Sequence, residues 1–485
     1  MARSHRGDDH VVAGAQLPGS GSGPYFLGAS GGTSSLLGNA GGGHDLRRAR
    51  DDFPALRQKI NGRRLVWLDS GATTQKPQVV IDRVRDFYQA DNSNVHRAAH
   101  TLAARATEIY EGARATVARF LGAGDASEIV FTRSATEALN LVAHSAGARF
   151  VGEGDEIVLS ELEHHSNIVP WQLLAERTGA RVKVLPIDDA GDVRLDELPS
   201  VLGPRTRVLA VTAASNALGT VVPLEPLITA AHACGALVVV DGAQAVAHLP
   251  LDVTALDVDF FVFSGHKIFG PTGIGALYGK RRLLEEMPPW QGGGSMIDTV
   301  TFERSTYAPV PAKFEAGTGH IAGAAGLATA LDYVDAIGRA AIMEHELELV
   351  GYLVRRLGEL PRLDIVGHPR VRGSAVSFVA DGMAPEEVAR HLDQDGIAVR
   401  AGHHCAQPVL RRFGLTSTVR PSVALYNTTD DVDELVASLC RLLTPTRLSS
   451  RVRSQQLPPR DAPRSGLPQP AGSDEWTGIR TRMIV

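Results

Sequence analysis

The sequence contains little cysteine and no long apolar run. Its three cysteines, Cys234, Cys405 and Cys440, lie far apart among 485 residues. They make no disulfide framework, and free thiols suit a reducing compartment. The apolar runs are only as long as strands, and the N-terminus lacks the charged start and continuous apolar stretch of a signal peptide. These absences argue against a membrane protein and predict a cytoplasmic one.

The composition that is present suits a large folded protein. With 44% hydrophobic and 21% charged residues, the chain can bury a large core, and its length predicts two domains plus tails. A net charge of -5 argues against nucleic acid as the main partner, although the C-terminal end is locally rich in arginine.

Both ends of the chain differ from the middle. Residues 1–45 are dominated by Gly, Ser and Ala without an apolar period, so they are predicted to be disordered. Two short apolar islands in this leader, residues 24–28 and 34–38, are either chance hydrophobic residues or a docking motif. Residues 446–485 are rich in Pro, Arg and Ser and are predicted to form a second disordered tail.

Between the tails, strand and helix patterns alternate as in a parallel sheet covered by helices, which predicts the α/β class. Strands are expected at residues 128–131, 155–159, 182–185, 207–211, 236–240 and 260–263, with helices such as 137–144 and 170–178 between them. Beyond residue 325, an amphipathic stretch precedes a small α+β unit with a strand at 375–379 and a closing helix at 431–443. We therefore predict a large domain, residues 46–325, and a smaller one, residues 326–445.

A lysine at the end of an expected strand, Lys267, is the most informative residue. Asp241 ends the preceding strand, and Cys405 lies far downstream in a polar loop near Arg400. An amine for a Schiff base, a carboxylate that keeps a pyridinium protonated and a thiol that accepts sulfur are the groups that pyridoxal 5'-phosphate (PLP) needs to remove sulfur from cysteine. Positive charge near Cys405 would favour its thiolate, whereas Cys234 and Cys440 are most simply core residues.

A candidate phosphate site follows the strand that ends at residue 131. Residues 132–137 open a helix, so N–H groups around Ser134, Ala135 and Thr136 and the Thr136 hydroxyl could face an anion. A simple helix cap is the alternative, and taken alone it is favoured. Ser264 and His266 beside Lys267 supply further donors, which favours phosphate.

Polar residues after other strands complete the candidate cofactor site. Asp241 would face the pyridine nitrogen and Gln244 the ring hydroxyl, although an aspartate there is usually a cap or turn former. Arg420 could bind a substrate carboxylate through two parallel hydrogen bonds, with Asn216 as a companion; the alternatives are a surface ion pair and a turn residue.

Two histidine pairs, 164–165 and 403–404, raise the possibility of a zinc site with Cys405. Adjacent histidines on an extended segment point to opposite sides, and neither pair has the usual spacing of metal ligands. We therefore expect no metal, and we expect His164 to stack on the cofactor ring and to exchange protons with the substrate.

Taken together, these residues resemble the group II, SufS-type cysteine desulfurases of the Suf iron-sulfur assembly system, within the class V aminotransferase family. The resemblance runs from about Asp51 to Leu443 and includes residues 68–77 and 94–97. It implies a fold type I PLP enzyme with a mostly parallel seven-stranded sheet, working as a homodimer, that converts L-cysteine to L-alanine and leaves sulfur on Cys405 as a persulfide. Carried over by position, the site residues are Lys267 as Schiff-base lysine, Cys405 as sulfur carrier, His164 as stacking residue, Asp241 and Gln244 as cofactor anchors, Ser134, Ala135, Thr136, Ser264 and His266 at the phosphate, and Arg420, Asn216, Ala72, Arg400 and His96 at the substrate.

The chain departs from the family pattern in two places. Ala135 replaces a threonine, which removes one hydroxyl contact to the phosphate. Gly319, His320 and Ile321 stand where relatives commonly have Pro, Asn and Thr, and this segment bears on the phosphate contact normally donated by the neighbouring subunit.

The resemblance leaves other functions open. A selenocysteine lyase uses the same chemistry, and a catalytically idle binding protein would keep the same fold. The family implies a sulfur acceptor of the SufE or SufU kind, although no residue here identifies which. The Gly/Ser-rich leader, residues 1–45, is similar to the cargo segments of desulfurases packaged in encapsulin shells.

Overall fold

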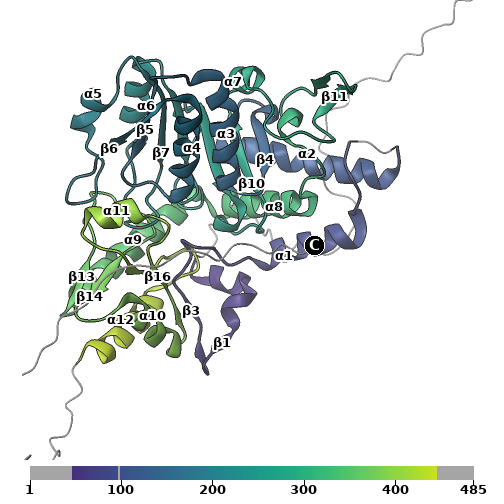
Figure 1. The fold of residues 1–485 in the computed structure, drawn as a ribbon. Helices are drawn as coiled ribbons and strands as arrows, with labels where there is room; N and C mark the ends of the chain where they lie inside the picture. The colour runs from purple at the N-terminus through teal and green to yellow at the C-terminus, as the bar shows by residue number, and fades with distance from the viewer. Residues whose placement is uncertain (1–45, 97–98, 445–485) are drawn as a thin grey trace, which may run out of the picture. The chain divides into compact units, whose positions relative to one another are not determined.

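The computed structural model describes residues 46–96 and 99–444 (Figure 1), and those up to Leu443 belong to the same unit. The predicted tails, residues 1–45 and 446–485, lie outside the described residues, as do the two apolar islands. Within the described ranges, no helix combines the length and the apolar character that crossing a membrane requires.

A seven-stranded sheet organises this unit, with the strand order β4-β10-β9-β8-β7-β5-β6. Strand β10 is antiparallel to both of its neighbours, and all other neighbouring strands are parallel. The predicted α/β class and mostly parallel sheet are confirmed. The strands are β4 (Ile129–Thr132), β5 (Glu156–Ser160), β6 (Arg181–Leu185), β7 (Thr206–Thr212), β8 (Leu237–Asp241), β9 (Phe260–Ser264) and β10 (Gly275–Gly279).

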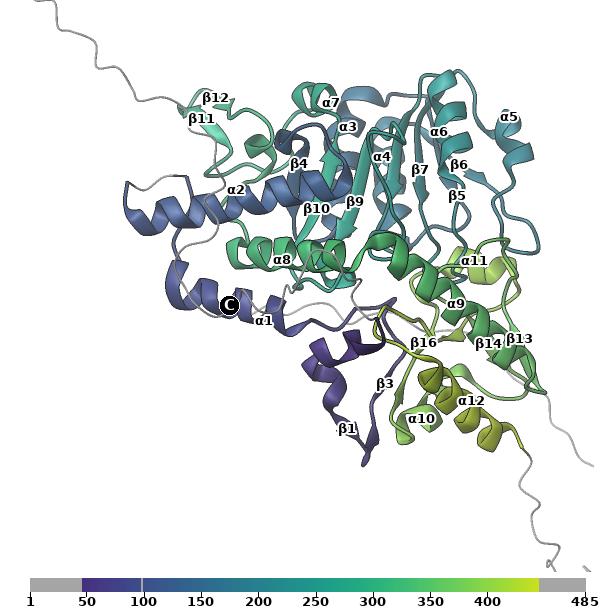
Figure 2. The same cartoon turned by 180° about the vertical axis from the view of Figure 1, so that it is seen from behind.

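Helices cover both faces of this sheet because both faces are apolar. Side chains alternate along a strand, so Phe260 and Val262 of β9 join a hydrophobic cluster with α3 and α4, whereas Phe261 and Phe263 join a second cluster with α2, α6 and α8. Figure 1 shows α3 and α4 in front of the strands, and Figure 2 shows the opposite face. The helices are α2 (Thr101–Leu121), α3 (Ala135–Phe150), α4 (Val169–Thr178), α6 (Leu224–Ala233) and α8 (Ile321–Ile337).

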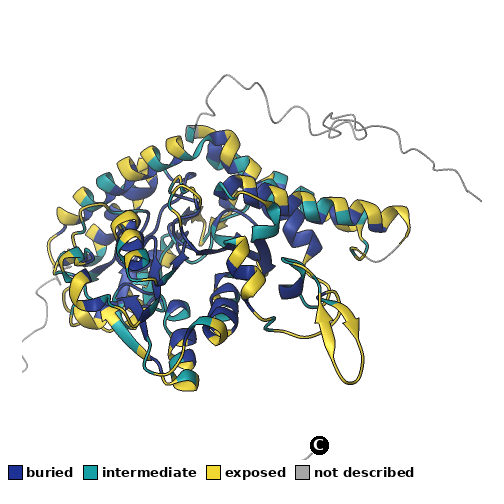
Figure 3. Cartoon of the chain, turned by 90° about the horizontal axis from the view of Figure 1, so that it is seen from above, coloured by how far each residue is buried: buried dark blue, intermediate teal, exposed yellow. Residues whose placement is uncertain are grey.

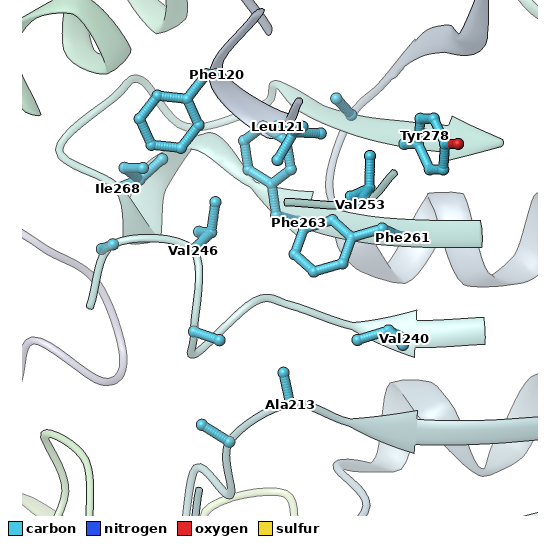
Figure 4. Close-up of a cluster of buried hydrophobic side chains, with 14 of the residues drawn as sticks. Phe120, Leu121, Ala213, Val240, Val246, Val253, Phe261, Phe263, Ile268 and Tyr278 are labelled. Carbon is cyan, nitrogen blue, oxygen red and sulfur yellow. The ribbon is translucent and has the colours of Figure 1, made fainter. Parts of the chain in front are cut away.

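The second cluster fixes the strands that carry the candidate site residues. Phe261 and Phe263 pack near Val240 of β8 and near Phe120 and Leu121 of α2, and all five are buried (Figure 4). Truncating a buried phenylalanine to alanine costs about 3–5 kcal/mol. The ends of β8 and β9 are therefore held in fixed relative positions.

A smaller sheet gathers the C-terminal segments. Its strand order is β13-β14-β17-β16, with all pairs antiparallel, and α9, α10 and α12 pack on it around a hydrophobic cluster of its own. The predicted boundary near residue 326 falls inside α8, so the division into two domains stays a prediction. These elements are α9 (Arg339–Gly358), β13 (Leu363–Ile365), β14 (Phe378–Ala380), α10 (Pro385–Gln394), β16 (Arg400–Gly402), β17 (Thr418–Arg420) and α12 (Thr429–Leu443).

Short elements complete the unit. A two-stranded hairpin, β11 and β12, stands out as exposed in Figure 3. The parallel pair β3 and β15 joins the N-terminal segment to the smaller sheet region. The remaining strands and α-helices of the described residues are β1 (Lys59–Ile60), β2 (Arg63–Arg64), β3 (Val66–Trp67), α1 (Gln78–Asp86), α5 (Leu198–Val201), α7 (Arg281–Glu286), β11 (Ile297–Val300), β12 (Ser305–Tyr307), β15 (Ile397–Ala398) and α11 (Gln407–Arg412).

The strand β10 was not among the six strands expected from sequence. It is five residues long and begins and ends with glycine, and such residues usually punctuate strands rather than form them. Gly275 is needed because a β-carbon there would lie 2.5 Å from the carbonyl oxygen of Phe263 and 2.9 Å from the Cα of Ser134. The glycine thus lets β10 lie against both β9 and the start of α3.

Gly275→Ala should destabilise the protein by about 1–3 kcal/mol, because the backbone must shift to admit the methyl group. Chemical denaturation measures this change. Gly203→Ala is the matched control, since a β-carbon there meets nothing within 4 Å, and its effect should stay within about 0.5 kcal/mol. Equal effects of the two substitutions would contradict the packing argument.

Candidate active site

A cavity of about 300 Å³ lies where three neighbouring parallel strands end. Thr212, Asp241 and Ser264 are the last residues of β7, β8 and β9, and all three line the cavity. Open α/β sheets bind ligands at this edge. The lining residues are Gly71, Ala72, Ser134, Ala135, Thr136, His164, Ser166, Thr212, Ala214, Asn216, Asp241, Ala243, Gln244, Ser264, His266, Lys267 and Arg400.

Lys267 and Asp241 provide an amine and a carboxylate in this cavity. Burial lowers the pKa of Lys267 to about 8; Asp241 acts against this shift, and Arg420 and Arg400 add to it. The Asp241 carboxylate accepts a hydrogen bond from the Ala243 N–H at 2.9 Å, and burial raises its pKa. At pH 7 roughly a tenth of the Lys267 amine is therefore unprotonated and able to act as a nucleophile, far more than for an ordinary lysine.

The predicted phosphate donors meet beside Lys267. Ser264 Oγ accepts a hydrogen bond from the Ala135 N–H at 2.9 Å, and the hydroxyls of Thr136 and Ser166 lie 2.8 Å apart. Burial lowers the pKa of His266 to about 4, so this imidazole is neutral and can donate only one ring N–H. The start of α3 and two hydroxyls thus surround a space that suits an anion.

His164 is neutral in this environment. Burial lowers its pKa to about 3, and Lys267 adds to the effect. Its Nδ1 accepts the N–H of Ser166 at 3.0 Å, which holds one edge of the ring. A neutral imidazole lining the cavity suits stacking on an aromatic ring.

Arg420 is fully buried and joins three distant segments. Its Nη1 donates to the Asn216 carbonyl oxygen at 2.8 Å, and its Nη2 donates to Asp69 Oδ1 at 3.0 Å. Its Nε has no hydrogen-bond partner among the described residues. This Nε–H can donate to one further acceptor, although Arg420 itself is not among the residues that line the cavity.

The loop that carries Cys405 is held in an unfavourable backbone conformation. His404 and Cys405 have φ angles of 53° and 54°, in the left-handed region that non-glycine residues rarely adopt. His404 is buried and bonds to Thr418, its carbonyl accepts from Asn216 Nδ2 at 2.5 Å, and the Cys405 carbonyl accepts from the His165 N–H at 2.8 Å. Such strain persists only where surrounding contacts impose it, and it is concentrated at functional sites.

The Cys405 thiol lies at the rim of the cavity rather than in its lining. Its Sγ is 3.9 Å from Arg400 Nη2, and Arg400 does line the cavity. Cys405 is also among the charges that act on the pKa values of Lys267 and Arg420. The thiol and the amine, well over a hundred residues apart in sequence, are therefore brought within electrostatic reach of each other.

His165, His403 and Cys405 place three possible metal-ligand atoms within 4.8 Å of one another. The argument from adjacent histidines missed this grouping, because one histidine comes from each pair. However, His165 Nε2 accepts the Gln407 N–H and His403 Nδ1 accepts the Cys405 N–H. A neutral imidazole has only one lone-pair nitrogen, so both rings already use the electron pair that a metal would need.

One predicted site residue, His96, lies away from this cavity. His96 bonds to Glu111 at 2.9 Å and lines a separate cavity of about 700 Å³ that shares no residue with the smaller one. Gly319 and His320, which stand where the chain departs from the family pattern, line that same larger cavity. A role for His96 at the substrate therefore stays a prediction.

Sequence reasoning missed Asp69, Ser166 and Thr212. Asp69 lies within residues 68–77, a segment that carries the family resemblance. An acidic side chain in that segment was the signal that could have identified Asp69 as a site residue. Ser166 follows His164 by two residues, and Thr212 ends a strand beside Asp241. A rule that collects every polar residue at the carboxyl end of a parallel strand would have found Thr212.

Comparison with known proteins identifies close relatives. Residues 66–435 match the aminotransferase class-V family. The chain is 56% identical to the cysteine desulfurase of Synechococcus elongatus over 83% of its own length and 64% of the relative's length. It is 55% identical to the probable cysteine desulfurase of Mycolicibacterium paratuberculosis over 82% of its own length and 58% of that protein. The chain thus spans about three fifths of these two relatives.

Other relatives are matched almost completely. The cysteine desulfurase of Dickeya dadantii is 52% identical, with 82% of this chain and 97% of that protein covered. Among solved structures, the cysteine desulfurase CsdA from Escherichia coli, with S-sulfonic acid, matches with a TM-score of 0.76 and 42% identity, over 82% of this chain and 98% of that one. The apo cysteine desulfurase from Thermococcus onnurineus matches with a TM-score of 0.76 and 37% identity, over 81% and 98%.

The family match covers more than half of the 485 residues, and it includes the strands and loops that form the cavity. The chain therefore belongs to the aminotransferase class-V family, where it groups with the cysteine desulfurases.

Proposed function

We propose that this protein is a PLP-dependent cysteine desulfurase of the group II, SufS type. The observation that carries the proposal is the meeting of the Lys267 amine, the buried Asp241 carboxylate and the Cys405 loop at one cavity. The high identity to cysteine desulfurases over most of the chain supports it.

The residues around the cavity fit PLP. Lys267 offers the amine that would hold it, Asp241 offers a buried carboxylate, and the start of α3 with Ser264 and His266 offers donors for a phosphate. When bound, PLP supplies a protonated ring that accepts electrons from the substrate Cα. His164 would stack on that ring, and one N–H of the Gln244 amide is already used by the Gly71 carbonyl at 2.7 Å.

The chain's own residues then bind and orient L-cysteine. The free Nε–H of Arg420 would donate to the substrate carboxylate, and the Asn216 carbonyl accepts from the Nη1 of the same guanidinium. With a pKa of about 8, the Lys267 amine would serve as the base that removes the Cα proton of the substrate. Ala72, Arg400 and His96 are the further substrate residues that the resemblance implies.

Cys405 accepts the sulfur. Its thiolate attacks the substrate sulfur, so that an S–S bond forms and the C–S bond breaks. The electron pair of the broken bond stays with the carbon skeleton, which takes up a proton and becomes L-alanine. Arg400 Nη2 lies 3.9 Å from Sγ and brings a positive charge next to the sulfur that reacts.

Partners and location extend the proposal. A homodimer is supported by the exposed β11–β12 hairpin, where Phe302 is fully exposed and Val300 and Tyr307 are also exposed, because a second copy would cover such apolar side chains. We also propose a cytoplasmic protein with a SufE-like or SufU-like sulfur acceptor and with residues 1–45 as an encapsulin-docking segment.

Two measurements check these partners. Analytical ultracentrifugation should give a dimer at micromolar concentration, and a monomer would contradict the homodimer.

Co-expression with a shell protein should encapsulate the full chain but not a chain that lacks residues 1–45, so equal encapsulation would contradict the docking segment.

Cys405→Ala should reduce sulfide release from L-cysteine on the order of 100-fold or more, because the group that accepts sulfur is gone. Binding of PLP, measured by its absorbance, should be unchanged. Cys440→Ala on α12 is the matched control and should keep full activity. Full activity of Cys405→Ala would refute the sulfur-carrier role.

Selenide release that survives in this variant would instead favour a selenocysteine lyase, and a wild-type protein that binds no PLP would favour an idle binding protein.

The pH dependence of cofactor attachment should follow Lys267. Only the unprotonated amine can react, and its pKa of about 8 means that the rate should rise about tenfold per pH unit below pH 8 and level off above it. Stopped-flow absorbance after mixing apo-protein with PLP measures this rate. An ordinary lysine, with a pKa of about 10.4, would keep gaining rate beyond pH 9, and that result would contradict the assignment.

A further inference from the structure

One backbone carbonyl beside Lys267 accepts an unusual number of hydrogen bonds. The carbonyl oxygen of His266, the residue before Lys267, lies 3.0 Å from the Thr74 N–H and 3.1 Å from each of the hydroxyls of Thr73 and Thr74. The ammonium of Lys76 is 3.3 Å from the same oxygen. A carbonyl oxygen has only two lone pairs. Four donors from one short segment therefore surround this oxygen and restrict the orientation of its peptide group.

The Thr74 hydroxyl also ends the turn that contains Lys267. Residues Gly265–Lys267 form a short 3-10 helix, and in a continuing turn the Phe269 N–H would donate to the His266 carbonyl. Instead, the Phe269 N–H donates to Thr74 Oγ1 at 2.8 Å, and Thr74 Oγ1 donates to the His266 carbonyl. The hydroxyl therefore stands between the two groups, and Phe269 takes a positive φ of 60°.

Lys76 adds a positive charge to this arrangement. Its ammonium also bonds to the Thr74 carbonyl, and burial lowers its pKa to about 8. In the part of the chain that the structure describes, no carboxylate pairs with it in a salt bridge, unlike Lys183 and Lys280. An ammonium held by two carbonyl oxygens rather than by an acid is a weak way to stabilise a fold, because its desolvation is not offset by an opposite charge.

We propose that Lys76 is a positioning residue for Lys267: together with Thr73 and Thr74, it clamps the His266–Lys267 peptide and so sets the direction in which the lysine amine enters the cavity. The inference rests on the proposed PLP chemistry, because the direction of the amine matters only for attachment of a carbonyl compound. It goes beyond that chemistry because Lys76 does not line the cavity. The residue acts through the backbone and touches neither cofactor nor substrate.

The clamp acts on a group that must be aimed accurately. Reactions between held groups depend on near-ideal approach, and a displacement of about 1 Å can cost up to 100-fold in rate. Lys267 directly follows the residue whose carbonyl is clamped, so loss of the Lys76 hydrogen bond leaves the peptide plane on its N-terminal side held only by Thr73 and Thr74. The opposite side is held by Phe269, again through Thr74.

The experiment measures attachment of PLP to the apo-protein rather than turnover. Lys76→Met removes the charge and the hydrogen bonds at similar length, Lys76→Arg restores a donor cation, and Lys59→Met alters an exposed lysine on β1 as the control. Full-length apo-proteins are mixed with PLP well below their unfolding temperatures. The appearance of linked cofactor is followed by absorbance, and borohydride reduction with peptide mapping gives the fraction attached at Lys267.

Lys76→Met should slow attachment at Lys267 about tenfold, Lys76→Arg should recover most of the rate, and Lys59→Met should match the wild type. An unchanged rate in Lys76→Met would overturn the proposal. So would slow attachment that only parallels a lower unfolding temperature and returns to the wild-type rate on cooling, since that is a stability effect. If the wild-type apo-protein attaches no PLP, the proposed function itself fails, which is a different result from equal rates in wild type and variant.

Discussion

The guanidinium of Arg420 is fully buried, and its hydrogen bonds hold together three parts of the chain that are otherwise far apart in sequence. Asp69 comes from the N-terminal segment, Asn216 follows strand β7 of the large sheet, and Arg420 ends β17 of the small sheet. A buried cation must be hydrogen-bonded and balanced by charge, and loss of one partner of such a pair is far more costly than loss of a surface pair. The active-site cavity depends on these hydrogen bonds of Arg420.

The hydrogen bonds of Arg420 also determine how the Cys405 loop and the N-terminal segment are held. Asn216 uses its side chain to hold the carbonyl of His404, so the same residue that receives Arg420 also fixes the Cys405 loop. The β-carbon of any residue larger than glycine at Gly71 would lie 3.0 Å from Arg420 Nη2, so Gly71 lets the N-terminal segment approach closely. The left-handed backbone of His404 and Cys405 is therefore imposed by contacts on both sides of the loop.

The electrostatics of the cavity depend on the same convergence. Arg420 and Arg400 both lower the pKa values of Lys267 and His164, in addition to the larger effect of burial. Burial, with this positive charge adding to it, keeps the His164 imidazole neutral and lowers the pKa of the Lys267 amine to about 8. These effects suit a site that binds anionic groups and needs unprotonated nucleophiles.

The sequence by itself determined the α/β class, six of the seven strands of the large sheet and most residues of the cavity. The class and the strands could be predicted because most strands of this sheet are apolar runs. The structure places most of the predicted site residues at one cavity, because polar residues that follow parallel strands meet at one edge of the sheet, while their roles stay predictions. Strand β10 (Gly275–Gly279) was not predicted because glycine in a sequence indicates a turn as often as it indicates a close approach between backbones.

Only the tertiary structure decided which distant residues share a contact. It placed Asp69 on Arg420, one histidine from each pair beside Cys405, and Thr73, Thr74 and Lys76 on the carbonyl before Lys267, while His96 came to lie in a separate cavity. The physical reason is that periodicity reports which face of an element is buried, whereas a hydrogen bond between segments separated by hundreds of residues depends on how whole layers pack.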